Sequence, residues 1–260
     1  MSVDAAALAD VLRSAEDDRR EIAKLTEEHP ELEVTDAYEV QRLGFERRLA
    51  EGDRFLGYKL GLTSRAKQLA MGVADPLWGR LRAGLLHDEE VPLDVSGLIH
   101  PRVEPEIAFL LGGEVDGATA TTASVLAATH GVFPALEILD SRYTDFKFTL
   151  PDVIADNASA AGVVCGGRLL QPAAMDVQLE GMVLRRDGEV VDTAAGAAVS
   201  GHPAAAVAWL ARQVGVLPAG AIVISGGLTA PVALAPGTTI SASFTHLGSV
   251  TLRCAGSAAR

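Results

Sequence analysis

Hydrophobic positions recur at three- and four-residue spacing over residues 3–50, which is the repeat of amphipathic helices. Asp36 and Glu39 form an Asp-x-x-Glu pattern, which predicts a capping box at the start of the second helix. We therefore predict two N-terminal helices, which form a helical region over residues 1–54 and pack on one side of a larger core.

Beyond residue 54 the pattern changes to short apolar or alternating runs separated by glycine, proline and aspartate, as is typical of strands. Predicted strands cover residues 55–60, 103–111, 133–139 and 221–225. Asp187-Gly188 between two strand-like runs predicts a hairpin, and apolar spacing over 203–214 predicts a late helix. The predicted fold class is α+β, with a β-rich domain over residues 55–260 that forms one structural unit with the helices.

The composition excludes several classes of partner. The 260 residues are 48% hydrophobic and 22% charged, which is typical of a globular protein. A formal net charge of −12 disfavours binding to nucleic acid or to an anionic membrane. The N-terminus does not resemble a secretory signal, and no run is typical of a membrane helix. Cys165 and Cys254 follow no metal-ligand spacing and are too few for a disulfide framework, so the alternatives are free thiols or a single disulfide. A reducing compartment is the simpler interpretation, and we expect a cytoplasmic protein.

A Glu-x-Glu pair lies in the predicted strand 103–111. Successive side chains of a strand point to opposite faces, so Glu104 and Glu106 point to the same face. Two carboxylates at this spacing repel one another unless they are solvated, protonated or bridged by a cation. The pair indicates either an exposed strand face or a site for a hard divalent ion.

Glu137 favours the metal site, because apolar residues on both sides of it predict a buried strand. A lone carboxylate there would be unfavourable by several kcal/mol without a partner. That partner is a cation such as Lys59 or Arg142, or a metal shared with Glu104 and Glu106. Carboxylate oxygens and water suit Mg2+ or Mn2+, whereas Zn2+ favours His and Cys. We therefore predict that the three glutamates bind Mg2+ or Mn2+.

Other polar residues allow two interpretations each. Lys59, which glycines flank, is either an active-site cation or a surface lysine with a packed stem. The polar turn at 156–159 is either a helix cap or a set of substrate hydrogen bonds. His202 before Pro203 is either the residue that enters the late helix, which is the simpler interpretation, or a catalytic residue. The sequence holds no phosphate-binding loop, zinc-protease motif or serine-hydrolase elbow, which disfavours those chemistries.

A series of short motifs runs in order along nearly the whole chain. They are residues 36–41 (DAYEVQ), 59–64 (KLGLTS), 101–107 (PRVEPEI), 137–142 (EILDSR), 155–159 (ADNAS), 201–203 (GHP) and 247–250 (LGSV). In this order they resemble the hydratases and decarboxylases of aromatic meta-cleavage pathways, a family within the fumarylacetoacetate hydrolase superfamily. The resemblance implies the superfamily's mixed β-roll core, a homo-oligomer, metal binding by Glu104, Glu106 and Glu137, and an active-site position for Lys59.

The family contains two sister activities. Its hydratases add water to 2-hydroxypenta-2,4-dienoate, and its decarboxylases form that compound and CO2 from 2-oxohex-3-enedioate (4-oxalocrotonate). The corresponding segment of the hydratases resembles a Pro-Asp-(Phe/Tyr)-Gly pattern. In this chain the segment is 75–79 (DPLWG), where Leu77 takes the place of the acid. Tyr143 and Phe146 also resemble the decarboxylases. We expect the decarboxylase activity, with the hydratase as the alternative because Asp75 lies close in sequence.

The resemblance implies a small 2-oxo dicarboxylate as substrate. We expect Lys59 to pair with a substrate carboxylate or to assist proton movement, and Leu77 to lie near the departing carboxylate. Arg142 and Ser159 are the further substrate-binding candidates. A third interpretation is a catalytically silent subunit, since decarboxylases of this family associate with their hydratases. A complex with a sister hydratase is therefore among the expected partners.

Overall fold

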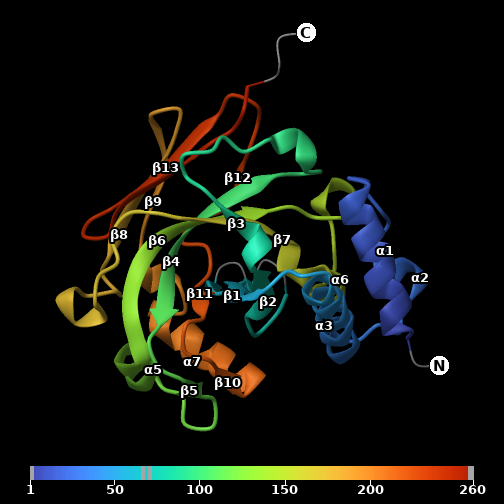
Figure 1. Ribbon diagram of the computed structural model, residues 1–260, viewed down its shortest axis with the longest axis horizontal. Coiled ribbons are helices and arrows are strands. Elements are labelled where there is room, and N and C mark those ends of the chain that lie inside the picture. Colours follow the sequence, from blue (N-terminus) through green and yellow to red (C-terminus); the bar gives the residue numbers. More distant parts are fainter. Residues whose placement is uncertain (1–2, 66–67, 70–71, 257–260) are drawn as a thin grey trace.

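The structure, a computed structural model, describes residues 3–65, 68–69 and 72–256. A helical layer comes first in the chain: α1 (Ala5–Asp17), the short α2 (Leu25–Glu28) and α3 (Val34–Ala50). Figure 1 shows these helices on one flank of the molecule, next to α6 (Leu150–Ala155). The two longer helices confirm the predicted N-terminal pair. The division at residue 54 stays a prediction.

The start of α3 differs from its prediction. Asp36 occupies the third position of the helix, where its carboxylate accepts a hydrogen bond from the Glu33 N–H at 3.3 Å. Glu33 is the capping residue, so the capping box lies three residues earlier than the Asp36–Glu39 spacing predicted. A glutamate at the cap replaces the usual short polar residue, which is why the pattern gave the wrong register.

The largest sheet is mixed, with eight strands among the described residues. Seven of them lie side by side in the order β2 (Leu77–Arg82), β1 (Phe55–Gly61), β11 (Ile222–Ile224), β4 (Arg102–Leu111), β6 (Thr129–Leu139), β7 (Ala160–Cys165) and β3 (Leu86–His87). The eighth, β12 (Val232–Ala233), pairs with β4. Pairs β1–β11 and β3–β7 are parallel, and the other pairs are antiparallel. All four predicted strands are present in this sheet, and β6 begins earlier than predicted.

A second, antiparallel sheet has the order β14 (Gly248–Arg253), β13 (Thr239–Phe244), β8 (Gly181–Arg186) and β9 (Glu189–Ala195). Asp187 and Gly188 join β8 to β9 and both have positive φ, which confirms the predicted hairpin. The late helix α7 (Pro203–Val214) has its predicted bounds. His202 caps it, because its Nδ1 accepts a hydrogen bond from the Ala204 N–H at 3.0 Å, which confirms the helix-entry interpretation.

Further short elements lie among the described residues: α5 (Thr122–Ala128) packs beside α7, and β5 (Val115–Asp116) pairs with β10 (Val216–Leu217). The main core joins the sheets to α7 through residues such as Phe109, Leu210 and Val250. A second core joins the helical layer to Leu77 of β2. The α+β class is confirmed. Within the described ranges, the helices lack the length and apolar character needed to cross a membrane.

Candidate metal centre and active site

Three buried glutamates meet where β4 and β6 pair. Glu104 lies directly opposite Glu137 in the register of the two strands, and Glu106 lies two residues further along the same face of β4. One carboxylate oxygen of each lies within 4.8 Å of the others. Glu106 and Glu137 are fully buried, and Glu104 is 7% exposed. We call these three residues the carboxylate wall.

Burial and mutual repulsion make the carboxylate wall unfavourable as three free anions. Burial, followed by the charges of Glu137 and Glu104, raises the pKa of Glu106 well above its ordinary value. Burial also raises the pKa of Glu137, although the nearby Lys59 ammonium opposes this shift. Glu106 Oε1 and Glu137 Oε2 have no hydrogen-bond partner among the described residues. A divalent cation with oxygen ligands fits this set, since it would occupy the unpaired oxygens and offset the repulsion.

Two glycines after β11 complete the carboxylate wall, and sequence reasoning missed both. The Gly226 N–H donates a hydrogen bond to Glu106 Oε2 at 2.6 Å. A Cβ atom on Gly227 would lie 2.2 Å from Glu104 Oε2, so any other residue there would displace the Glu104 carboxylate. The signal was the glycine pair directly after the apolar run 221–225, since such pairs mark a close approach of the backbone to another group.

Lys59 comes from β1 and is buried beside the carboxylate wall. Its Nζ lies 2.9 Å from Glu137 Oε1 and donates a hydrogen bond of 2.8 Å to the carbonyl oxygen of Ala158. Its side chain is 3% exposed, so the surface-lysine interpretation is wrong. The two partners predicted for Glu137 are a cation and a metal shared with Glu104 and Glu106. The structure places the Lys59 ammonium beside Glu137, and it also groups Glu137 with the other two glutamates.

A cavity of about 280 Å³ opens beside these groups. Lys59, Glu104 and Ser159 line its polar side. The rest of the lining is mainly apolar and includes Leu62, Leu77, Leu139, Phe146, Phe148, Val153 and Pro231. Leu77 and Ser159 therefore lie where a bound molecule would contact them, as predicted substrate-binding residues should. Ser159 is 3% exposed, and its hydroxyl has no hydrogen-bond partner among the described residues.

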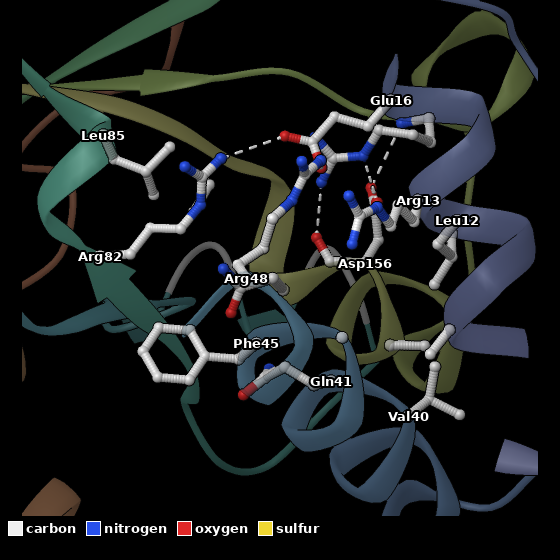
Figure 2. A pocket seen from close by; sticks show the side chains of 16 residues that line it. Leu12, Arg13, Glu16, Val40, Gln41, Phe45, Arg48, Arg82, Leu85 and Asp156 are labelled. Atoms are coloured by element: carbon white, nitrogen blue, oxygen red, sulfur yellow. Dashed lines mark hydrogen bonds and ion pairs between the residues drawn. The ribbon is translucent and has the colours of Figure 1, made fainter. Parts of the chain in front are cut away.

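Arg142 does not line this cavity, and the predicted substrate-binding role does not fit its placement. Its guanidinium pairs with the Asp156 carboxylate and donates a hydrogen bond to the Asp156 carbonyl at 2.7 Å. Both side chains are buried, and Arg142 faces a second cavity between α1, α3 and the sheet. Figure 2 shows Asp156 in that cavity with Glu16 and Arg48. A buried guanidinium needs a carboxylate partner, and Asp156 supplies it.

The fold and the site define a class: a mixed-sheet enzyme whose buried glutamates suit a divalent metal beside a small, largely apolar cavity. A model of the fumarylacetoacetate hydrolase C-terminal domain matches residues 82–254, which include all three glutamates. The chain belongs to the fumarylacetoacetate hydrolase family.

Two relatives narrow this class further. The 4-oxalocrotonate decarboxylase of Pseudomonas sp. (strain CF600) is 41% identical over 251 residues, or 95% of each chain. The solved structure of the 4-oxalocrotonate decarboxylase from Pseudomonas putida G7, complexed with magnesium and adipate, has a TM-score of 0.94. It is 39% identical and covers 96% of this chain and 97% of its own. These similarities confirm the predicted family and its β-rich fold.

A hydratase is nearly as similar. The 2-hydroxyhexa-2,4-dienoate hydratase of Comamonas testosteroni is 40% identical over 236 residues, or 88% of each chain. Sequence identity alone therefore separates the two activities poorly. The residues around the cavity decide between them.

Proposed function

We propose that this chain catalyses the Mg2+- or Mn2+-dependent decarboxylation of 2-oxohex-3-enedioate to 2-hydroxypenta-2,4-dienoate and CO2. The observation that carries the proposal is the carboxylate wall beside a cavity that has Leu77, not an acid, on its apolar side. The similar structure complexed with adipate supports the substrate class, because adipate is also a six-carbon dicarboxylate. The decarboxylase relative at 41% identity supports the reaction.

Glu104, Glu106 and Glu137 would hold the cation through carboxylate oxygens. When bound, the cation supplies Lewis-acid chemistry at the C2 ketone, next to the C1 carboxylate. The bond between C5 and C6 breaks, CO2 leaves, and the electron pair passes through the C3=C4 double bond to the C2 oxygen. Negative charge therefore develops on the side of the cavity where the positive charges are held, which stabilises the transition state more than the substrate.

Lys59 has three N–H donors, and two of them face Glu137 and the Ala158 carbonyl. The third is available to a substrate oxygen in the cavity that Lys59 lines. We assign Lys59 to hold or deliver a proton at the oxygen that gains charge. The unpaired Ser159 hydroxyl supplies a second hydrogen bond to the substrate.

The apolar side of the cavity acts on the departing group. Leu77, Leu139 and Phe148 offer no hydrogen bond to a C6 carboxylate. A charged carboxylate is unfavourable there, whereas neutral CO2 is not, so loss of charge is favoured as the bond breaks. The same residues exclude the water that a hydratase must admit.

The hydratase remains the second candidate because relatives with that activity are 40% identical. Its acid has no counterpart in the cavity: Asp75 is exposed and is not among the lining residues, so Glu104 is the one described carboxylate there. A silent partner subunit is the third candidate. We also propose a homo-oligomer and an association with a sister hydratase, which rest on the family resemblance, and a cytoplasmic location, which rests on the sequence features given above.

Purified chain with Mg2+ should be incubated separately with 2-oxohex-3-enedioate and 2-hydroxypenta-2,4-dienoate, while CO2 release and loss of the dienol absorbance are followed. CO2 from the first compound without consumption of the second supports the decarboxylase. Consumption of the second without CO2 from the first replaces it with the hydratase. If neither reaction occurs, the result indicates the silent subunit.

A further inference from the structure

Three consecutive residues between α6 and β7 have the left-handed backbone conformation. Their φ angles are 50° for Asn157, 55° for Ala158 and 58° for Ser159. None is glycine, and residues other than glycine, asparagine and aspartate rarely adopt this conformation. Such a segment persists only where surrounding contacts determine it. We call residues 156–159 the turn wall, because Ala158 and Ser159 line the same cavity as Glu104 of the carboxylate wall.

The Asn157 side chain joins this segment to the backbone of a neighbouring strand. Its Oδ1 accepts a hydrogen bond from the Arg80 N–H at 2.8 Å, and its Nδ2 donates one to the Arg80 carbonyl at 2.9 Å. Arg80 lies in β2, the terminal strand of the large sheet. The Asn157 amide therefore pairs with the open edge of β2 as a neighbouring strand would.

The sequence of β2 allows this close pairing. A Cβ atom on Gly79 would lie 2.7 Å from the Asn157 carbonyl oxygen and 3.1 Å from its Oδ1. Any other residue at position 79 would push the turn wall away from the strand. Asn157 is also the one asparagine in the whole chain.

The turn wall delivers two polar groups to the cavity. The Ala158 carbonyl accepts the hydrogen bond from Lys59 Nζ, and the Ser159 hydroxyl is buried without a partner among the described residues. Asn157 itself does not line the cavity. A change in the position of Asn157 would therefore reach the substrate only through Lys59 and Ser159.

We propose that Asn157 is a positioning residue: its amide fixes the turn wall to β2 and so places the Lys59 ammonium and the Ser159 hydroxyl for the reaction. This inference rests on the proposed function of the site. Asp156 and Gln41 make further contacts at and just before the N-terminal end of the same segment. Asp156 pairs with Arg142, and the Gln41 Nε2 donates to the carbonyls of Trp78 and Ile154 at 3.1 and 2.9 Å.

Asn157→Gly tests this role, because glycine adopts a left-handed conformation readily and only the amide clamp is lost. We expect kcat for CO2 release to fall about tenfold to a hundredfold. KM should change by less than about threefold, since groups placed for the transition state affect kcat most. Mg2+ affinity should stay within about twofold of the wild type, because the carboxylate wall lies on β4 and β6.

Asp187→Gly is the matched control. Asp187 also has positive φ, of 52°, and its Oδ1 accepts a backbone hydrogen bond from Thr239 at 2.8 Å, but it lies in the hairpin of the second sheet. The same chemical change there should leave kcat unchanged. An equal loss of kcat in both variants would overturn the proposal, because it would report loss of fold stability.

A double-mutant cycle with Lys59→Met makes the test specific. If Asn157 acts through Lys59, Asn157→Gly lowers kcat by a smaller factor in the Lys59→Met background than in the wild type. Equal factors in both backgrounds, or an unchanged kcat in the single variant, would overturn the proposal. If Asn157→Gly does not fold, Asn157→Asp, which keeps the acceptor for Arg80, is judged by the same criteria. Absence of CO2 release from the wild type would overturn the proposed function instead.

Discussion

The carboxylate wall lies in two neighbouring strands of one sheet, whereas the turn wall is a short left-handed segment between a helix and a strand. In the first, regular antiparallel register brings Glu104 opposite Glu137 without any strained residue. In the second, three left-handed residues depend on hydrogen bonds to β1 and β2. The carboxylate wall, with its regular strands, is suited to hold a charged ion at fixed distances. The turn wall, with its left-handed residues, is suited to place groups that act on the substrate.

Glu106→Gln should have the largest effect, because it breaks the carboxylate wall and leaves the turn wall intact. We expect Mg2+ affinity and kcat to fall, with kcat lower by on the order of a hundredfold to a thousandfold, as for loss of a major electrostatic contact. Steady-state assays and a Mg2+ titration measure both. Glu114→Gln, at an exposed position, is the matched control. Undiminished activity of Glu106→Gln without added metal would remove the three-glutamate site from consideration.

Leu77→Asp leaves the carboxylate wall unchanged and tests the cavity lining instead. It places a charge on the apolar side of the cavity, next to the turn wall. Decarboxylation should fall about tenfold or more, because the departing carboxylate would face a like charge in a largely apolar cavity. Leu77→Asn separates charge from polarity and should lose less activity. Equal losses in the two variants would show that the charge of the new group does not matter. The assay is CO2 release at saturating Mg2+.

A smaller effect should appear in the stability of the metal-free protein. The pKa of Glu106 is raised in the fold, so above the ordinary glutamate value of 4.5 the folded chain binds more protons than the unfolded chain. The contribution of this residue to stability is therefore lost as pH rises toward its folded pKa. In chelator, the unfolding temperature should fall with rising pH more steeply in the wild type than in Glu106→Gln. Parallel curves would contradict the raised pKa.

Much of the carboxylate wall was predictable from the sequence, because it follows local rules. Strand alternation places Glu104 and Glu106 on one face, and apolar neighbours bury Glu137. The hairpin at Asp187-Gly188 and the bounds of α7 followed from equally local signals. The sequence around Lys59 supports two interpretations, since its spacing alone does not show which side of the sheet it reaches.

The turn wall was not predictable in the same way. The sequence of residues 156–159 does not predict a left-handed backbone at Ala158 and Ser159. The contacts that fix this backbone come from β2, which is distant in the sequence. The same holds for Arg142, whose partner Asp156 was visible only as a turn residue. The roles of Gly226 and Gly227 also depend on the approach of β4 to the end of β11.

A calorimetric titration of the metal-free protein with Mg2+ tests the central claim most directly. The three-glutamate site predicts one ion per chain, with proton release that reflects the raised pKa of Glu106, and loss of this binding in Glu106→Gln but not in Glu114→Gln. Binding of equal strength in the wild type and Glu106→Gln, or no binding to the wild type, would contradict it.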